Sequence, residues 1–389
     1  MFKVRTYNQI SNKGLDRFPP EKYEVASEIP QPDAFMLRSQ KLHDEPVPET
    51  VVAVGRAGAG VNNIPVAAYS EKGIVVFNAP GANANAVKEL VAAALLLSSR
   101  DIFGGMNYVQ SLKEMDDAGE MSKLLEKQKK QFAGGEISGK TLGVVGLGAI
   151  GSMVANMALE LGMNVAGYDP AISVEAAWRL SSRVQKMENL QSLLAVSDFV
   201  TVHVPAIPQT QGLINTETLR HFKPTAKLLN FAREEIVDTK AIVTALDSKA
   251  IAGYISDFPT PELLGREDVL LMPHIGASTE EAEENCAIMV ADQLMDYLEN
   301  GNIRNSVNFP PTRMARNGGF RITFCNQNVP KVLGNVLTLL ADRNINVIDM
   351  VNKSRDDVAY NIIDIASEPT ESLLAEIADV DGVVRVRAV

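Results

Sequence analysis

Three side chains whose types suit the oxidation of an alcohol occur in the second half of the chain. Arg233 and His274 each follow a short apolar run, and Glu262 lies in a loop between them. An imidazole can take a proton from a hydroxyl group, a carboxylate can orient that imidazole and raise its pKa, and an arginine can hold a neighbouring carboxylate. The set therefore predicts hydride removal from a 2-hydroxy acid. Judged from these residues alone, His274 could equally be an ordinary loop histidine.

A glycine motif precedes these residues in the chain. Gly146, Gly148 and Gly151 stand between the apolar run 141–145 and a helical pattern. The first glycine allows a tight turn, the second lets the backbone approach a pyrophosphate, and the third lets the new helix pack closely. The amide groups at the start of that helix suit phosphate binding. Asp169, at the end of the next apolar run, would accept hydrogen bonds from a ribose diol and repel a 2′-phosphate, which favours NAD over NADP.

Charge and histidine spacing limit the ligands. The 389 residues carry a formal net charge of −11, which disfavours nucleic acid as a partner because phosphate backbones bind basic surfaces. A small anionic substrate must then meet local arginines, and Arg38 and Arg56 each follow a strand pattern. The histidines lack the spacing of metal ligands, so we expect no metal. His203 lies among strand residues and is expected to be structural or beside the cofactor.

Alternating strand and helix patterns must position these groups. Residues 1–90 read as an open α/β sheet, and residues 91–279 repeat strand and helix signals typical of a doubly wound parallel sheet. Residues 280–300 predict one long amphipathic helix. Residues 317–389 follow the order β-α-β-β-α-β, which is the ferredoxin-like order. The fold class is therefore α/β, with two Rossmann-like domains and a ferredoxin-like domain at the C-terminal end.

The cysteines and the apolar runs argue against a disulfide-stabilised protein and against a membrane-spanning one. Cys286, in a predicted helix, and Cys325, in a predicted strand, fit buried reduced thiols better than a disulfide. The longest apolar run, Leu90 to Leu97, is too short to cross a bilayer. The N-terminal residues lack the features of a signal peptide. We therefore expect a cytoplasmic protein without a membrane partner.

Besides the glycine motif, several segments match a pattern known from one protein family: Leu37–Ser39, Arg56–Ile64, Asn78–Asn83, His203–Pro205, Asn230–Arg233, Asp257 with Glu262, Pro273–Thr279 and Ser306–Pro310. Through them the chain resembles, over essentially its whole length, the D-isomer-specific 2-hydroxyacid dehydrogenases. The resemblance implies two similar α/β domains, the first formed by 1–90 and 280–310 and interrupted by an NAD-binding domain at 91–279. It also implies an ACT domain at 317–389.

The resemblance also implies roles for individual residues. Arg233, Glu262 and His274 become the catalytic set, and Arg38, with its neighbour Ser39, and Arg56 fall where family members that act on phosphoglycerate bind substrate. The residues implied around NAD are Gly146, Gly148, Ala149, Ile150, Gly151, Asp169, Val204, Pro205, Asp257, Gly276 and Ala277.

The implied reaction is oxidation of 3-phospho-D-glycerate with NAD, at the entry to serine biosynthesis, by a homo-oligomer such as a dimer or tetramer. A hydroxypyruvate or glyoxylate reductase, and an NAD-sensing regulator without catalysis, are the alternatives. Asn328 and Asn346 resemble an amino-acid effector site of ACT domains, from which Lys331 and Asn326 depart because Gly and His are usual there. Two further residues depart from the family. The family usually has Gly after the catalytic arginine, where this chain has Glu234, and usually has Asp where this chain has Asn62.

Overall fold

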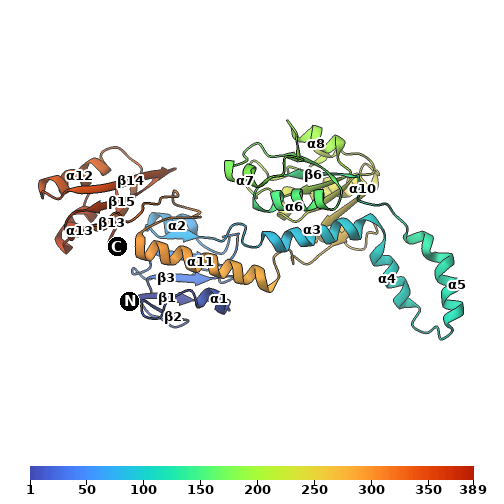
Figure 1. Ribbon diagram of the computed structural model, residues 1–389, viewed down its shortest axis with the longest axis horizontal. Helices are drawn as coiled ribbons and strands as arrows, with labels where there is room; N and C mark the ends of the chain where they lie inside the picture. The colour runs from blue at the N-terminus through green and yellow to red at the C-terminus, as the bar shows by residue number, and fades with distance from the viewer. The chain divides into compact units, whose positions relative to one another are not determined.

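The computed structural model describes the backbone of residues 1–389 and every side chain except that of Glu175. The chain forms two compact units (Figure 1). The first unit comprises Met1–Asn83 and Glu280–Val389, and the second comprises Ala84–Thr279.

The first unit contains a five-stranded parallel sheet with the strand order β2-β1-β3-β4-β5. The order reverses between β1 and β3, and ligands of such sheets bind at the carboxyl ends of the strands beside this switch point. Both faces of β3 are buried, as its apolar sequence AFML requires. The strands are β1 (Phe2–Thr6), β2 (Tyr23–Ala26), β3 (Ala34–Leu37), β4 (Ala53–Arg56) and β5 (Val75–Phe77).

Helix α11 (Glu280–Asn300) returns the chain to this sheet and packs on β3, β4 and β5. Its buried positions recur every three or four residues, which is the spacing of one helix face. Those positions include Cys286, Val290, Leu294 and Tyr297. Two short helices, α1 (Asn12–Leu15) and α2 (Val66–Glu71), complete this part of the unit.

The second unit contains a seven-stranded parallel sheet with the order β12-β11-β10-β9-β6-β7-β8. This is the strand order of a Rossmann fold, and it reverses between β6 and β9. The strands are β6 (Thr141–Val145), β7 (Asn164–Tyr168), β8 (Gln185–Lys186), β9 (Phe199–Val202), β10 (Lys227–Asn230), β11 (Gly253–Ser256) and β12 (Val269–Leu271).

Helices cover this sheet, and two of them form an arm. The covering helices are α3 (Ala84–Ser99), α6 (Ala149–Glu160), α7 (Val174–Arg179), α8 (Leu190–Val196), α9 (Thr216–Leu219) and α10 (Thr239–Asp247). Helices α4 (Ile102–Ser111) and α5 (Ala118–Gln128), with the 3₁₀ turn η1 (Lys129–Phe132), project from the end of α3 (Figure 1). Neither α4 nor α5 has a buried residue.

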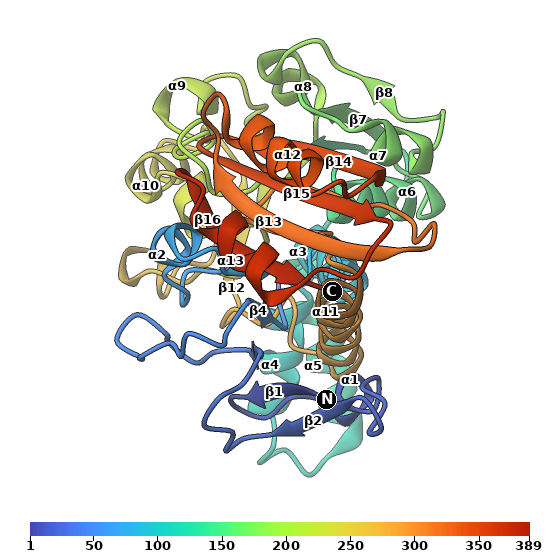
Figure 2. The same ribbon diagram turned by 90° about the vertical axis from the view of Figure 1, so that its left-hand side faces the viewer.

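Residues 320–388 form a C-terminal module with an antiparallel sheet of order β14-β15-β13-β16. This is the ferredoxin-like order, and α12 and α13 cover one face of the sheet (Figure 2). The elements are β13 (Phe320–Gln327), α12 (Val332–Asp342), β14 (Val347–Arg355), β15 (Val358–Ile365), α13 (Glu371–Ala378) and β16 (Val383–Ala388).

The other face of the module's sheet packs against the rest of the first unit. Cys325, Tyr360 and Ile362 belong to the same apolar cluster as Tyr297 and Phe309. The Tyr360 ring meets the Phe309 ring edge-on, with centroids 6.2 Å apart. The two sheets of the first unit therefore share one hydrophobic core.

A buried ion pair lies in the same seam. The Arg321 side chain is 0% exposed, and its Nε and Nη2 donate to the two carboxylate oxygens of Asp364 at 2.6 and 2.8 Å. The remaining donors reach the carbonyl groups of Asn300, Met314 and Ala315 at 2.9–3.0 Å. One guanidinium thus joins β13, β15, the end of α11 and the linker that follows it.

The predicted α/β class with a ferredoxin-like C-terminal domain is confirmed. The long helix from Glu280 to Asn300 is found as predicted, and Cys286 and Cys325 are buried free thiols. The strands β2 and β8 did not stand out in the sequence. Among the described residues, no helix combines the length and apolar content needed to span a bilayer.

Candidate functional site

The glycine loop joins β6 to α6 at the switch point of the second unit. Gly146 has φ +88°, and a Cβ there would lie 2.8 Å from the carbonyl oxygen of His203. A Cβ on Gly151 would collide with the carbonyl oxygen of Gly146. A Cβ on Gly148 would meet nothing within 4 Å, so the backbone there faces open space at the start of α6. The loop therefore has room for a dinucleotide pyrophosphate where a side chain would fill it.

Asp169 follows β7 and is partly exposed beside this loop. Its Oδ2 accepts a hydrogen bond from the Leu147 amide at 2.8 Å, and its Oδ1 accepts one from the Ala171 amide at 2.9 Å. These bonds hold the carboxylate at the carboxyl ends of β6 and β7. A carboxylate offers about four lone-pair sites, so it retains capacity for ribose hydroxyl groups.

Val204 and His203 follow β9 on the other side of the switch point. The Val204 side chain lies against the glycine loop, because its Cγ1 would be 2.8 Å from a Cβ on Gly146. His203 Nε2 is 2.9 Å from the Thr201 hydroxyl oxygen. Its Nδ1 is buried and has no partner among the described residues, and burial lowers the pKa of the imidazole to about 3. His203 is therefore neutral at physiological pH. Pro205 follows and is exposed.

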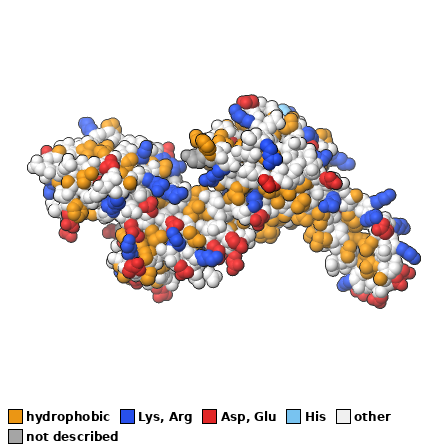
Figure 3. Space-filling view, in the orientation of Figure 1, with side chains coloured by type: hydrophobic (Ala, Val, Ile, Leu, Met, Phe, Trp, Pro, Cys, Tyr) orange, Lys and Arg blue, Asp and Glu red, His pale blue; other side chains and the backbone are white. Residues whose placement is uncertain are grey.

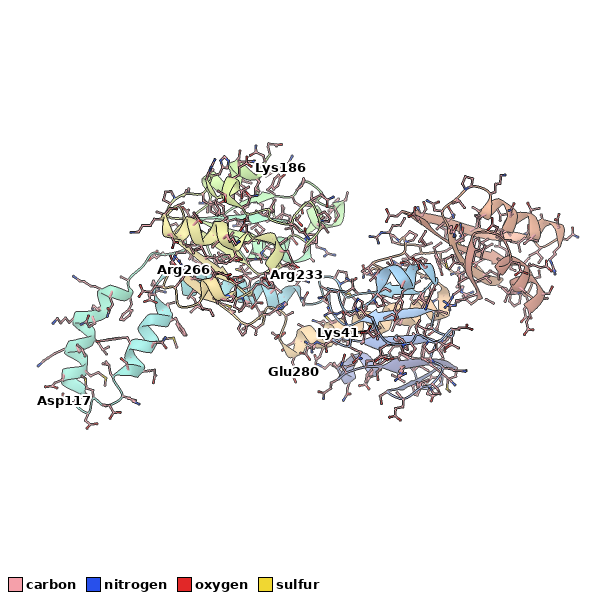
Figure 4. The ribbon with its side chains drawn as sticks, turned by 180° about the vertical axis from the view of Figure 1, so that it is seen from behind. Lys41, Asp117, Lys186, Arg233, Arg266 and Glu280 are labelled. Carbon is pink, nitrogen blue, oxygen red and sulfur yellow. The ribbon has the colours of Figure 1, made fainter. Side chains whose placement is uncertain are left out.

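Arg233 lies just beyond β10, in a turn that Asn230 builds. The Asn230 side chain is buried; its Nδ2 donates to the Arg233 carbonyl oxygen at 2.9 Å, and its Oδ1 accepts from the Ala232 amide at 3.1 Å. The Arg233 guanidinium is half-buried and donates to the Ala232 carbonyl at 2.6 Å. Figure 4 labels Arg233 within the second unit. Glu234 follows in the exposed 3₁₀ turn η2 (Glu234–Ile236).

Asp257 organises the turn that carries His274. Its carboxylate is buried and accepts hydrogen bonds from the amides of Ile275 and Gly276 at 2.8 and 2.7 Å. Its carbonyl oxygen accepts from the His274 amide at 3.0 Å. His274 takes φ +57°, a left-handed conformation that residues other than glycine adopt rarely and that is often found at functional sites. The sequence suggested Asp257 as a cofactor contact, and the structure gives its carboxylate the further task of holding this turn. Ala277 follows in the same turn.

The His274 imidazole is exposed and contacts the Phe258 ring, with centroids 5.0 Å apart. Glu262 lies in the exposed 3₁₀ turn η3 (Pro261–Leu263). Among the described side chains, no hydrogen bond joins Glu262 to His274. Catalytic hydrogen bonds commonly tighten only when substrate is bound, so the pair stays a prediction. The structure does bring Arg233, Asp257 and His274 to the carboxyl ends of the neighbouring strands β10, β11 and β12.

Arg38 and Arg56 lie together in the first unit. Arg38 follows β3 at the switch point, and Arg56 ends the neighbouring strand β4, paired in register with Leu37. The Arg56 Nε donates to the Arg38 carbonyl oxygen at 3.1 Å. The two guanidinium groups thus belong to adjacent strand ends, where an anionic ligand of this sheet is expected.

Two asparagines that the sequence did not single out build this loop. Asn8 Oδ1 accepts from the amides of Ser39 and Gln40 at 3.0 and 2.7 Å. Asn63 Nδ2 donates to the carbonyl oxygens of Arg38 and Gln40 at 3.2 and 2.7 Å. Asn8 lies in a bend just after β1, and Asn63 lies in a turn, so neither position carries a distinctive sequence signal.

Glu283 on α11 is the acidic neighbour of this arginine pair. Its Oε1 lies 2.5 Å from Arg38 Nη1, and both side chains are partly exposed. A phosphate or carboxylate that binds Arg38 would compete with this internal carboxylate.

The residues suggested for an amino-acid effector lie in the C-terminal module. Asn328 is exposed, and its Nδ2 already donates to the Asp356 carbonyl oxygen at 3.0 Å. The exposed Asn346 follows α12. Lys331 takes φ +80°, a conformation that favours glycine. Asn326 is buried and accepts a hydrogen bond from Asn361 at 2.8 Å.

Comparisons with known proteins agree with this architecture. Residues 104–276 match the NAD binding domain of the D-isomer specific 2-hydroxyacid dehydrogenases. The chain is 40% identical over 329 residues to the D-3-phosphoglycerate dehydrogenase of Synechocystis sp., covering 80% of this chain but 56% of that protein. It is 34% identical over 353 residues to the D-3-phosphoglycerate dehydrogenase of Escherichia coli strain K12, covering 87% of this chain and 82% of that protein. The chain thus spans little more than half the length of the first of these relatives.

Solved structures show the same fold. The NAD⁺-bound 3-phosphoglycerate dehydrogenase of Entamoeba histolytica is 26% identical, with a TM-score of 0.61 over 79% of this chain and 98% of that chain. The NAD complex of a D-isomer specific 2-hydroxyacid dehydrogenase from Lactobacillus delbrueckii ssp. bulgaricus is 22% identical, with a TM-score of 0.62 over 79% of this chain and 100% of that chain. The predicted family and its NAD-binding domain are confirmed. The chain belongs to the D-isomer specific 2-hydroxyacid dehydrogenases.

Proposed function

We propose that this protein oxidises 3-phospho-D-glycerate to 3-phosphohydroxypyruvate with NAD, the first step of serine biosynthesis. The observation that carries the proposal is the placement of Arg38 and Arg56 on adjacent strand ends at the switch point of the first unit. Paired guanidinium groups suit a phosphate because they donate several charge-assisted hydrogen bonds in a fixed geometry. The relatives named D-3-phosphoglycerate dehydrogenase support the same substrate.

The second unit supplies the groups for the chemical step. NAD, when bound, accepts the hydride from the carbon that bears the hydroxyl group. His274 takes the hydroxyl proton as general base, and Arg233 binds the neighbouring carboxylate and fixes the carbon for attack. Glu262 orients the imidazole once substrate is present and favours its charged form. Asp257 is a positioning residue, because it accepts hydrogen bonds from the amide of His274 and from the amides of the two residues that follow it.

The glycine loop fits the cofactor. The open face at Gly148 and the start of α6, with Ala149, Ile150 and Gly151, would hold the pyrophosphate, and Asp169 would bind the adenosine ribose and exclude a 2′-phosphate. Around the rest of NAD we place Val204, Pro205, Gly276 and Ala277.

The arm of the second unit suits a partner copy, so we propose a homo-oligomer. On α4, Phe103 and Met106 are 60% and 61% exposed, and Val109 is also exposed. Figure 3 shows hydrophobic side chains on the surface of the arm. Several exposed large apolar side chains on one helix mark an interaction surface. We also propose that the C-terminal module is an ACT domain and that the protein works in the cytoplasm. The engaged Asn328 amide and the side chain of Lys331 favour a weak serine response or none.

The first test is NADH formation with 3-phosphoglycerate and with unphosphorylated 2-hydroxy acids. Arg38→Ala should lower kcat/KM for 3-phosphoglycerate about 10- to 150-fold, the equivalent of about 1.5–3 kcal/mol for a lost charge-assisted hydrogen bond. Reduction of hydroxypyruvate, which lacks the phosphate, should suffer less. Arg17→Ala is the matched control, since Arg17 is an exposed arginine of the same unit that pairs with Asp292 on α11.

The outcomes separate the alternatives. Equal losses on phosphorylated and unphosphorylated substrates would assign Arg38 a structural role and favour the hydroxypyruvate or glyoxylate reductase. Binding of NADH without turnover of any 2-hydroxy acid would favour the NAD-sensing protein.

The second test concerns the general base. His274→Asn should lower kcat about 10²- to 10⁴-fold, because proton transfer to a positioned side chain contributes this much. NADH binding should be retained, since the glycine loop and Asp169 are untouched. His221→Asn, a change of the same kind at an exposed histidine, is the control. Turnover close to that of the unmodified protein would remove His274 from the mechanism.

A further inference from the structure

A cavity of about 710 Å³ lies within the first unit, between the C-terminal module and the five-stranded sheet. Strand β16 forms one side of it, and the chain around α2 and β4 forms the other. Figure 2 shows the ribbon of β16 near that of α2. The volume is in the range of small-molecule sites. It is remote from the strand ends that carry Arg38 and Arg56, because it opens where β4 and β5 begin: its lining includes Val52 and Ile74.

The walls of the cavity are fixed by close packing. A Cβ on Gly73, which adjoins Ile74, would lie 2.7 Å from Cys325 Sγ and 3.0 Å from the Arg385 Cβ. The Arg385 Nη1 donates to the Val51 carbonyl oxygen at 2.5 Å. The module and the sheet therefore meet in van der Waals contact at the edge of the cavity.

The charges that line the cavity are unbalanced. Its polar side chains are Lys72, Arg385, Arg387 and Glu49. Arg385 and Arg387 alternate along β16, so both point from the same face of the strand. The same face of the sheet carries Arg321 on the neighbouring strand β13, and Asp364 neutralises its charge. Arg385 and Arg387 donate to backbone carbonyl groups instead, and among the described side chains no carboxylate pairs with either of them.

Two of the cations retain unused hydrogen-bonding capacity. Arg387 packs over the Tyr297 ring and donates from Nη2 to the Leu298 carbonyl at 3.2 Å, while its Nη1 is buried and has no acceptor among the described residues. Lys72 is exposed at the end of α2, and none of the described carboxylates forms an ion pair with it. An excess of cations in a hollow, on a chain with a net charge of −11, concentrates small anions there.

We infer that this cavity is a binding site for a small organic dianion. Lys72 and the arginines of β16 would meet the anionic groups, and Val52 and Ile74 would contact a short carbon skeleton between them. The ligand would touch the module and the five-stranded sheet together, so its binding would stabilise the seam between them. This site is separate from the proposed reaction, and its test does not depend on turnover.

The test is calorimetric titration of the full-length protein at low ionic strength with succinate and, separately, glycerol 3-phosphate. The two probes distinguish a preference for carboxylates from a preference for a phosphate. Lys72→Glu should weaken binding about tenfold or more, because it replaces a charge-assisted contact with repulsion. Lys353→Glu makes the same charge change on an exposed lysine of β14 and should leave binding unchanged.

Saturating 3-phosphoglycerate serves as a second control. If the cavity is the site, binding of the better probe should persist in its presence and should raise the melting temperature of the unmodified protein more than that of Lys72→Glu. Absence of binding for both probes would overturn the inference. Equal affinity of the Lys72→Glu and unmodified proteins, or complete loss of binding when 3-phosphoglycerate is added, would also overturn it.

Discussion

Replacing Asp364 with Asn should destabilise the seam between the C-terminal module and the rest of the first unit. Arg321 and Asp364 are 0% and 1% exposed, and their two hydrogen bonds are 2.6 and 2.8 Å long. The variant leaves a buried guanidinium without its counter-charge, a change that costs about 3–5 kcal/mol. Because the carbonyls of Asn300, Met314 and Ala315 still accept from Arg321, we expect a loss near 3 kcal/mol.

Two measurements check this value. Urea unfolding followed by circular dichroism gives the global loss of stability, and hydrogen exchange of the β13 and β15 amides gives the local loss, which matters because a chain of several units need not unfold in one step. Asp381→Asn removes the same charge from an exposed site and should change stability by less than about 0.5 kcal/mol. A loss of under about 1 kcal/mol for Asp364→Asn, with unchanged exchange in β13, would refute the reasoning.

Three further predictions concern single residues. Glu283→Gln frees Arg38 from its ion pair and should lower KM for 3-phosphoglycerate. The change should reach about fivefold at most, because a partly exposed ion pair contributes no more than about 1 kcal/mol. An unchanged KM would mean that the Glu283 carboxylate does not compete with substrate. Burial lowers the pKa of the His203 imidazole from 6.5 to about 3, so between these pH values the unfolded chain binds a proton that the native protein excludes. The free energy of unfolding should therefore fall as the pH drops from 6.5 towards 3, by at most about 1.4 kcal/mol per pH unit for this group. His203→Gln should remove that component of the pH dependence. Lys331→Gly relieves a left-handed residue and should raise the free energy of unfolding by about 0.5–1 kcal/mol, whereas a loss of stability would show that the lysine side chain makes a useful contact.

The sequence predicted most of the fold because buried parallel strands are short apolar runs. The strands that it did not reveal, β2 and β8, are edge strands with few buried residues. β2 has the burial pattern of a strand with one buried residue, and both residues of β8 are exposed. The order of elements in residues 317–389 did not reveal where α12 begins: it starts at Val332, directly after Pro330 and the left-handed Lys331. A hydrophobic pattern reveals a strand only where its side chains are buried, and β2 and β8 have few buried side chains.

The candidate site was predictable where a residue stands at a strand end. Gly146, Asp169 and His274 could be placed in this way. Glu283 could not, because its contact with Arg38 joins residues that are far apart in the sequence and depends on how α11 lies on β3 and β4. Asn8 and Asn63 were missed for the same reason. Their side chains act only by hydrogen bonding to the backbone of the loop at residues 38–40. An asparagine near a turn is too common in sequences to indicate such a role.

The shared core of the first unit also sets a limit on protein engineering. A ferredoxin-like domain at the end of a chain invites transfer to another enzyme as a cassette, cut at the linker before Phe320. Here a cassette cut at that point would carry Tyr360 and Ile362 with it but leave Tyr297 and Phe309 behind, so both fragments would present a bare apolar surface. A working chimera would have to take the α11 face together with the module. The unit that can be inherited or exchanged is therefore larger than the ferredoxin-like fold that it contains.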